Sequence, residues 1–142
     1  MFSSIQTAAG WEGWDSQTSH WIVVLGDQPH LRDATLQELL RRASIDNNSV
    51  SQPSWQGRGA HPIIIPRMLW EQIPPSRESS LKDFLTARAC RTVRIALDDA
   101  GLGLDLDTPE DYHTALAKFP PDKQVAADSS PASVSTNKND DR

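Results

Sequence analysis

Four stretches of the chain have the apolar or β-branched character of strands. Residues 21–25 (Trp-Ile-Val-Val-Leu) and 63–65 (Ile-Ile-Ile) are continuous apolar runs, and residues 49–55 and 92–96 have extended character. A continuous apolar run is typical of a strand covered on both faces, as in a parallel sheet between helices. We therefore expect residues 21–25 to form a strand that is buried on both faces.

Between these stretches, apolar residues recur at the spacing of one helix face. The pattern predicts a short helix at the start of the chain, with Ser3 or Ser4 as a possible cap. It predicts three further helices, whose apolar faces are Leu36/Leu39/Leu40/Ala43, Leu81/Phe84/Leu85 and Tyr112/Ala115/Leu116/Phe119. In the last helix, Thr108 can be the N-cap and Pro109 the first helical residue. Strands that alternate with helices predict an α/β fold.

The end of the chain differs in composition from the rest. Residues 120–142 contain no Leu, Ile or aromatic residue and are dominated by Ser, Asp, Lys, Asn and Pro. Such a segment cannot bury enough apolar surface to offset the entropy of ordering it. We expect one domain, at residues 1–119, and a disordered tail at residues 120–142.

Charge and cysteine content exclude several classes of protein. The chain has 14 Lys and Arg against 19 Asp and Glu, a net charge of −5, so it lacks the basic surface that nucleic-acid binding requires. Its start lacks the basic and apolar regions of a signal peptide, and no apolar run approaches the roughly 18 residues of a membrane span. The single cysteine, Cys90, allows no intrachain disulfide. We expect a cytoplasmic protein without a nucleic-acid or membrane partner.

Acidic residues stand at two chemically suggestive positions. Asp27 follows the first strand, and open α/β sheets bind ligands in the crevice beyond the carboxyl ends of their strands. A carboxylate there is a natural Mg²⁺ ligand, although Asp27 can equally shape the turn and cap the next helix. Asp105 and Asp107 alternate on an extended segment, where both face one side and repel each other unless a cation lies between them. Solvent screening, with Asp107 serving the helix terminus, is the alternative.

The turn Gly57-Arg58-Gly59-Ala60-His61-Pro62 brings a cation and an imidazole to the start of a strand. Arg58 can bind a phosphate with its forked guanidinium, and His61 can donate a hydrogen bond to a substrate oxygen. The alternatives are a solvated arginine and a turn histidine. The other histidines lack metal-ligand spacing, and Cys90 is most simply a small core residue.

Three motifs follow one another in a specific order. A strand is followed by GDQP at residues 26–29, GRGAHP at residues 57–62 precedes a strand, and DLDTPEDY at residues 105–112 opens the final helix. This order, with the Ser3-Ser4-Ile5 helix at the start, resembles the carboxyl-terminal part of the MobA-like NTP transferases. Within that family it resembles the molybdenum cofactor cytidylyltransferases more than the guanylyltransferases.

The resemblance implies a Rossmann-like three-layer α/β/α nucleotidyltransferase fold that is incomplete at the N-terminus. It also implies a Mg²⁺-dependent transfer of CMP from CTP, or GMP from GTP, to the phosphate of molybdopterin, with release of pyrophosphate. Asp27 matches the metal-binding acid of the family, and Asp107 matches a position near the metal or the acceptor, so both are candidate catalytic and metal-binding residues. Gly57 and His61 match the substrate-side loop. Together with Arg58 and Asp105, they are the candidate substrate-binding residues.

The family binds the triphosphate with a glycine-rich loop after its first strand, and this chain begins downstream of that position. Whether the chain is an enzyme by itself is therefore open. The resemblance implies that it is inactive without an amino-terminal phosphate-binding half or a homologous chain. The alternative is a non-catalytic remnant or interaction module that pairs with a full-length relative through the edge of its sheet.

Overall fold

The computed structural model describes residues 1–120. Within this range one sheet contains β1 (His20–Val23), β2 (Val50–Trp55), β3 (Arg58–Gly59), β4 (Ile63–Pro66) and β5 (Thr92–Ala96). β4 lies between β1 and β2, β5 lies on the other side of β2, and β3 forms a hairpin with β2. All the predicted strands are present. Apart from Pro120, the predicted tail lies outside the described residues.

The sheet is mixed, and β1 is not buried on both faces as its apolar run led us to expect. β1 pairs antiparallel with β4, with Trp21 opposite Ile65, and β1 has no second strand beside it in residues 1–120. Trp21 is buried, whereas its neighbour Ile22, which points to the other face, is 43% exposed. The helix on that face, α2 (Asp33–Ile45), packs over β2 and β4, so Ile22 lies beyond its cover.

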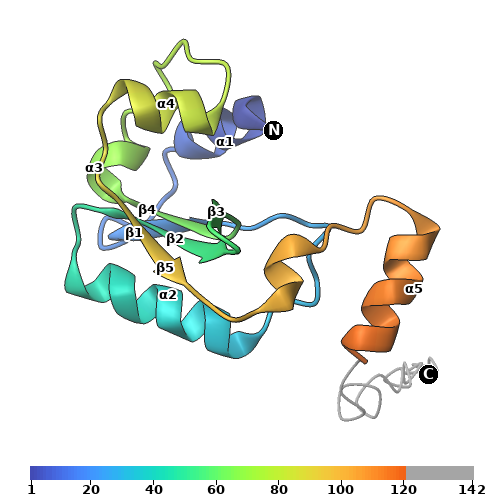
Figure 1. The fold of residues 1–142 in the computed structure, drawn as a ribbon. Helices are drawn as coiled ribbons and strands as arrows, with labels where there is room; N and C mark the ends of the chain where they lie inside the picture. The colour runs from blue at the N-terminus through green and yellow to red at the C-terminus, as the bar shows by residue number, and fades with distance from the viewer. Residues whose placement is uncertain (121–142) are drawn as a thin grey trace, which may run out of the picture.

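Helices cover both faces of the sheet (Figure 1). α1 (Phe2–Ala9), α3 (Arg67–Trp70) and α4 (Leu81–Ala87) lie on one face, and α2 lies on the other. The larger apolar cluster, beneath α1, α3 and α4, contains Phe2, Ile5, Trp21, Val50, Ile63, Ile65, Leu69, Trp70, Ile73, Leu81 and Phe84. The smaller cluster joins α2 to the sheet through Leu39, Ala43, Ile64 and Ile95. The predicted three-layer α/β/α arrangement is therefore confirmed.

A buried carboxylate ties α2 to the chain that leaves β5. Asp99 is only 2% exposed and accepts hydrogen bonds from the Thr35 hydroxyl, at 2.6 Å, and from the Gly101 backbone N–H, at 2.9 Å. The guanidinium of Arg32 lies 3.7 Å from the same carboxylate. Asp99 thereby caps the short 3-10 helix η1 (Ala100–Gly103), after which the chain returns towards the end of β1.

The last helix, α5 (Pro109–Lys118), begins as the sequence predicts. Thr108 and Asp111 form a capping box, in which each side chain bonds to the backbone N–H of the other residue. Figure 1 shows α5 standing apart from the sheet. Of its apolar face only Ala115 is buried, while Tyr112 is 51% exposed. The first helix differs from its prediction, because the residue before it is Met1 and neither Ser3 nor Ser4 caps it.

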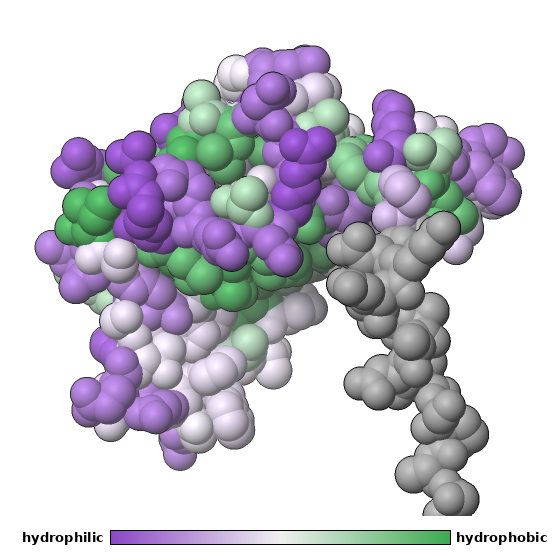
Figure 2. All heavy atoms as spheres, turned by 90° about the horizontal axis from the view of Figure 1, so that it is seen from below, coloured by the Kyte–Doolittle hydropathy of each residue, from purple (hydrophilic) through white to green (hydrophobic). Residues whose placement is uncertain are grey.

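The face seen in Figure 2 carries apolar side chains interspersed with polar ones. The large apolar residues with substantial exposure include Ile22, Val24, Leu40 and Ile45. Among the helices of residues 1–120, none combines the length and apolar character needed to cross a membrane.

Candidate functional site

The acidic turn after β1 is held by the segment that precedes α5. The backbone carbonyl of Asp27 accepts a hydrogen bond of 3.1 Å from the backbone N–H of Leu106. Asp27 Oδ1 is buried and has no hydrogen-bond partner within the described chain. The residue before α2 is Arg32, and no side chain caps that helix, so the alternative of Asp27 as a helix cap is wrong. A buried carboxylate oxygen without a partner is costly, which makes Asp27 a ready ligand for a cation.

Gln28 joins the two acidic segments directly. Its side-chain amide donates a hydrogen bond of 2.6 Å to Asp105 Oδ1. Gln28 is 5% exposed, and its Oε1 is buried without a partner within residues 1–120. In the sequence, Gln28 is only one letter of the GDQP motif, without a predicted contact. The structure therefore adds it to the residues that organise the site.

Asp107 is placed differently from Asp105. It is exposed, and the cap of α5 is made by Thr108 and Asp111, so Asp107 does not cap that helix. It lines neither the cavity that contains Asp105 nor the one that contains Asp27. The bonds of Asp27 and Gln28 to residues 105–106 bring the acidic segments together, but they leave the Asp107 carboxylate at the surface.

Three of the predicted residues share one cavity of about 310 Å³. We call it the Asp105 cavity, and its walls include Gln28, Trp55, Arg58, His61, Gly103 and Asp105. Gly103 is required there, because a Cβ at this position would lie 2.5 Å from the Trp55 ring. The arrangement places an acid, a guanidinium and an imidazole around one small space, as binding of a polar, charged ligand needs.

The loop that carries Arg58 and His61 is a turn, and it also lines cavities. Gln56 and Gly57 have positive φ angles of 51° and 77°, which form the tight hairpin between β2 and β3. His61 Nδ1 lies 3.4 Å from the carbonyl oxygen of Val23, so the imidazole stands at the end of β1. His61 can therefore be a turn residue and also donate a hydrogen bond to a substrate oxygen, so the two interpretations of this residue are compatible. Arg58 is exposed and forms no ion pair with a residue of the described range.

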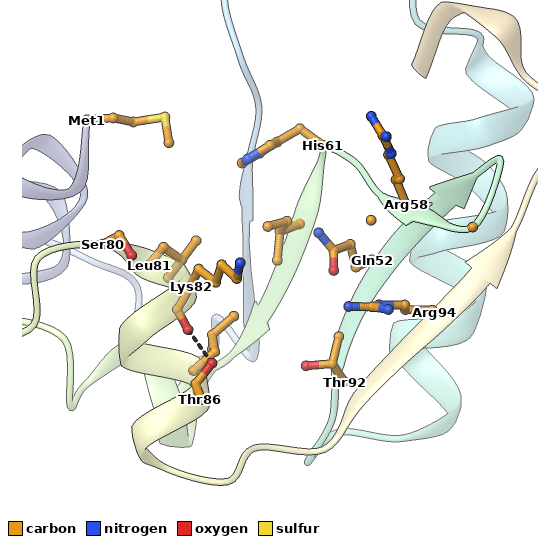
Figure 3. A pocket seen from close by; sticks show the side chains of 14 residues that line it. Met1, Gln52, Arg58, His61, Ser80, Leu81, Lys82, Thr86, Thr92 and Arg94 are labelled. Atoms are coloured by element: carbon orange, nitrogen blue, oxygen red, sulfur yellow. Dashed lines mark hydrogen bonds between the residues drawn. The ribbon is translucent and has the colours of Figure 1, made fainter. Parts of the chain in front are cut away.

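A second cavity, of about 550 Å³, lies between α4 and the sheet (Figure 3). We call it the Arg94 cavity. Its walls include Gln52 of β2, Lys82 of α4, Arg94 of β5, and Gly57, Arg58 and His61. Arg58 and His61 line both cavities. Neither Lys82 nor Arg94 belongs to a motif, and only the packing of α4 over β2 and β5 brings them together. Local sequence signals could not have identified them.

Asp27 borders a third space, of about 510 Å³, beside α1 and the exposed side of β1. Within residues 1–120, no group of three His, Cys, Asp or Glu side chains is close enough to hold a metal ion. Mg²⁺ does not need such a group, since one or two carboxylates suffice when substrate phosphates and water complete the octahedron. The unpartnered Oδ1 of Asp27 is a hard oxygen donor, and it fits that requirement.

Cys90 is not a nucleophile of this site. Its side chain packs against the larger apolar cluster. Burial raises the pKa of the Cys90 thiol, which keeps it protonated and unreactive at neutral pH. The interpretation of Cys90 as a small core residue agrees with this environment.

An acidic turn at a strand end, beside a basic loop in a three-layer α/β domain, is the kind of site in which α/β proteins bind nucleotides and other ligands. The chain belongs to the family described as the MobA-like NTP transferase domain, whose model matches residues 1–93. The family to which its motifs point is therefore confirmed. No curated protein matches the chain.

Solved structures of similar fold include two mycobacterial proteins. Rv0371c of Mycobacterium tuberculosis H37Rv, in complex with manganese, is 19% identical with a TM-score of 0.65, over 80% of this chain and 59% of that chain. The Rv0371c homolog from Mycobacterium sp. strain JC1 is 22% identical with a TM-score of 0.63, over 82% of this chain and 57% of that chain. At such identities the likeness is one of fold. The chain spans less than two thirds of the length of either protein.

Proposed function

We propose that this chain forms the acidic part of a nucleotidyl-transfer site. The reaction moves CMP from CTP, or GMP from GTP, to the phosphate of molybdopterin. An oxygen of the acceptor phosphate attacks the α-phosphorus, the bond to the bridging oxygen breaks, and pyrophosphate leaves with the electron pair. The observation that carries the proposal is the pair of hydrogen bonds that joins the turn at Asp27 to residues 105–106.

In this proposal Asp27 and Asp107 hold a divalent cation, Mg²⁺ or Mn²⁺. The bound cation neutralises the charge that builds up on the phosphates as transfer proceeds. The unpartnered Oδ1 of Asp27 supports this role, and so does the manganese in the Rv0371c complex. Asp107 is two residues from Asp105 on the segment that bonds to the turn, and its exposed carboxylate is free to approach a metal-bound nucleotide.

The segment of residues 57–62 then orients the substrates. Arg58 binds a phosphate oxygen through its guanidinium, and His61 donates a hydrogen bond to a substrate oxygen. Gly57 allows the hairpin that presents both side chains. Gln28 fixes Asp105, which faces the same cavity from the opposite segment. Positioning and charge neutralisation are the two contributions that phosphoryl transfer needs from a protein.

Transfer needs a segment that binds the triphosphate. Because the chain spans less than two thirds of the length of its structural neighbours, we propose that it acts together with an amino-terminal half or a homologous chain. We propose a cytoplasmic location, which the single cysteine of the chain supports.

The metal role can be tested by calorimetry and thermal melting. Mn²⁺ alone should bind to the 142-residue chain and raise its melting temperature. Asp27→Asn should abolish the Mn²⁺ response and leave the melt of the metal-free protein nearly unchanged. Asp98→Asn, at an exposed aspartate outside the site, is the matched control and should respond like the wild type. An equal response of the Asp27 variant and the control would contradict the proposal.

A second candidate function is an interaction module that pairs with a full-length relative. The exposed edge of β1 favours it, because Ile22 and Val24 are 43% and 51% exposed beside a strand that is paired on one side only within residues 1–120. Sedimentation of the chain should then show self-association that Ile22→Lys disperses. A monomer at all practical concentrations would contradict this function.

A further inference from the structure

The Arg94 cavity is lined by basic side chains and by no carboxylate. Lys82 and Arg94 line it together with Arg58 and His61, and its walls include no Asp or Glu. Figure 3 shows Lys82, from α4, and Arg94, from β5, extending towards each other from opposite walls. Arg58 stands at the rim above them. Two cations that converge on one space repel each other unless an anion lies between them.

This charge is unusual for the molecule. The chain as a whole carries a net charge of −5, and most arginines of residues 1–120 pair with a carboxylate, as Arg88 does with Glu78 and Arg91 with Asp46. None of the ion pairs in this range involves Arg58, Lys82 or Arg94. Within residues 1–120, the basic residues without an ion pair are Arg58, Lys82 and Arg94 around this cavity, and Arg77 and Lys118 outside it.

The other residues that line the cavity indicate the chemistry of the rest of the ligand. Leu81, Leu85 and Ile63 supply an apolar surface, and the amide of Gln52 and the hydroxyl of Thr92 supply hydrogen-bonding groups. The volume of about 550 Å³ suits a small molecule or one portion of a larger one. Gly59 leaves room for the Gln52 amide, because a Cβ there would lie 2.7 Å from Gln52 Oε1.

We propose that the Arg94 cavity binds the phosphate of a phosphorylated small molecule directly to Lys82 and Arg94, without a metal ion. A nucleoside triphosphate bound through a metal needs carboxylates, which this cavity lacks and the Asp27 and Asp105 segments supply. The ligand is therefore a second molecule, with a phosphomonoester and a partly apolar body. The binding of a phosphate in this cavity does not depend on the proposed function. Only the role of the bound molecule, as the acceptor of the transferred nucleotidyl group, rests on that function.

The position of the cavity supports that step. Arg58, Gly59 and His61 line both the Arg94 cavity and the Asp105 cavity. A phosphate held by Lys82 and Arg94 thus lies on the other side of one loop from the acidic segments. Donor and acceptor phosphates on either side of residues 58–61 can approach each other past the Arg58 guanidinium.

Calorimetry with phenyl phosphate as the probe, in EDTA and at low salt, tests the inference without any nucleotide. The wild-type chain should bind phenyl phosphate and inorganic phosphate but not phenol. Lys82→Gln and Arg94→Gln should each weaken phenyl phosphate binding roughly tenfold or more, because each removes a charge-assisted contact. Arg94→Lys keeps the charge and should lose less. Both residues are exposed, so the variants should fold like the wild type.

Two matched controls carry the same substitutions away from the cavity. Arg77→Gln removes an exposed arginine that has no ion pair within residues 1–120, and Lys118→Gln removes an exposed lysine. Both should bind phenyl phosphate like the wild type. If the wild type does not bind it at about millimolar concentration, or if the cavity variants bind it as well as the controls do, the inference is overturned.

The same variants separate this inference from the proposed function. Asp27→Asn should keep full binding of phenyl phosphate, and Lys82→Gln should keep the response to Mn²⁺ alone. If the wild-type chain binds phenyl phosphate but does not respond to Mn²⁺, the metal role is contradicted and the cavity stays assigned. If the wild-type chain responds to Mn²⁺ but does not bind phenyl phosphate, only the cavity is contradicted.

Discussion

The side-chain amide of Gln28 donates a hydrogen bond of 2.6 Å to Asp105 Oδ1, across 77 positions of the sequence. A backbone bond from Leu106 to the Asp27 carbonyl runs beside it. The donor is buried and the acceptor is in an exposed residue, so the two partners do not contribute equally to stability. The asymmetry makes the link between the acidic segments measurable.

Asp105→Ala should lower the free energy of unfolding by about 1–2 kcal/mol, because it leaves the buried Gln28 amide without an acceptor. Gln28→Leu should cost less, since it also removes the buried Oε1 that has no partner within residues 1–120. Urea unfolding of both single variants and the double variant gives their coupling. In the Gln28→Leu background, Asp105→Ala should change stability little, as Asp98→Ala should in the wild type. A full cost in both backgrounds would show that the bond is not what stabilises the loop.

Asp99→Ala should be the more damaging loss. It leaves the buried Thr35 hydroxyl and the Gly101 N–H without their acceptor, which should lower the free energy of unfolding by about 2–4 kcal/mol. Asp99→Asn keeps one oxygen acceptor and should cost less. Guanidinium unfolding, followed by Trp fluorescence, measures both. A change below about 0.5 kcal/mol for Asp99→Ala, the level of an ordinary surface substitution, would contradict the role of this carboxylate in joining α2 to η1.

The elements were predictable where their signals are local. Thr108, Pro109 and Asp111 specify the start of α5 by capping, which depends on residues within one turn. The apolar runs specify the strands in the same way. The exposure of Ile22 was not predictable, because it depends on where α2 packs and on which strands flank β1. The short α3 was also missed, since a single turn after Pro66 has no periodic pattern to detect.

The site was predictable only in part, for the same reason. The motifs identify Asp27, Asp105 and His61 as candidates, but the contact that fixes Asp105 comes from Gln28, far away in the sequence. Lys82 lies in an ordinary amphipathic helix, and Arg94 occupies one exposed position of a strand. Their convergence depends on the crossing of α4 over the sheet. The way in which α4 packs across the sheet cannot be predicted from a single sequence.

The loss of stability at acid pH should depend in part on Glu38. Hydrogen bonds from Arg41 and Arg42 lower the pKa of the Glu38 carboxyl from 4.5 to about 2. Because the folded-state pKa lies below the ordinary value, the stabilisation is complete above about pH 4.5 and is lost as the pH falls towards 2. Urea midpoints at pH 6 and pH 3 should therefore differ less in Glu38→Gln than in the wild type. The effect is small, since the pair is solvent-exposed.

Glu12→Gln is the control for that measurement, at an exposed glutamate that forms no ion pair within residues 1–120. It should leave the difference between the two pH values unchanged. If Glu38→Gln and Glu12→Gln both show the same difference in urea midpoint as the wild type, the cluster of Glu38 with its two arginines does not contribute to the loss of stability in acid.

Ala89→Gly should stabilise the protein. Ala89 has a φ angle of 45° and follows Arg88, the residue that ends α4. The backbone N–H of Ala89 and that of Cys90 bond back to Thr86 and Leu85, so this conformation is fixed by the end of the helix. A left-handed residue with a Cβ is strained by roughly 1–2 kcal/mol, and glycine removes that strain but is more flexible in the unfolded chain. We expect a net gain of about 0.5–1 kcal/mol in the free energy of unfolding.

The opposite sign is expected two positions earlier. Ala87→Gly places glycine inside α4, where it should lower the free energy of unfolding by up to about 1 kcal/mol. Chemical denaturation of both variants under identical conditions compares the same substitution in two backbone conformations. A loss of stability in both would show that Ala89 is not strained, and that the end of α4 adapts to its side chain.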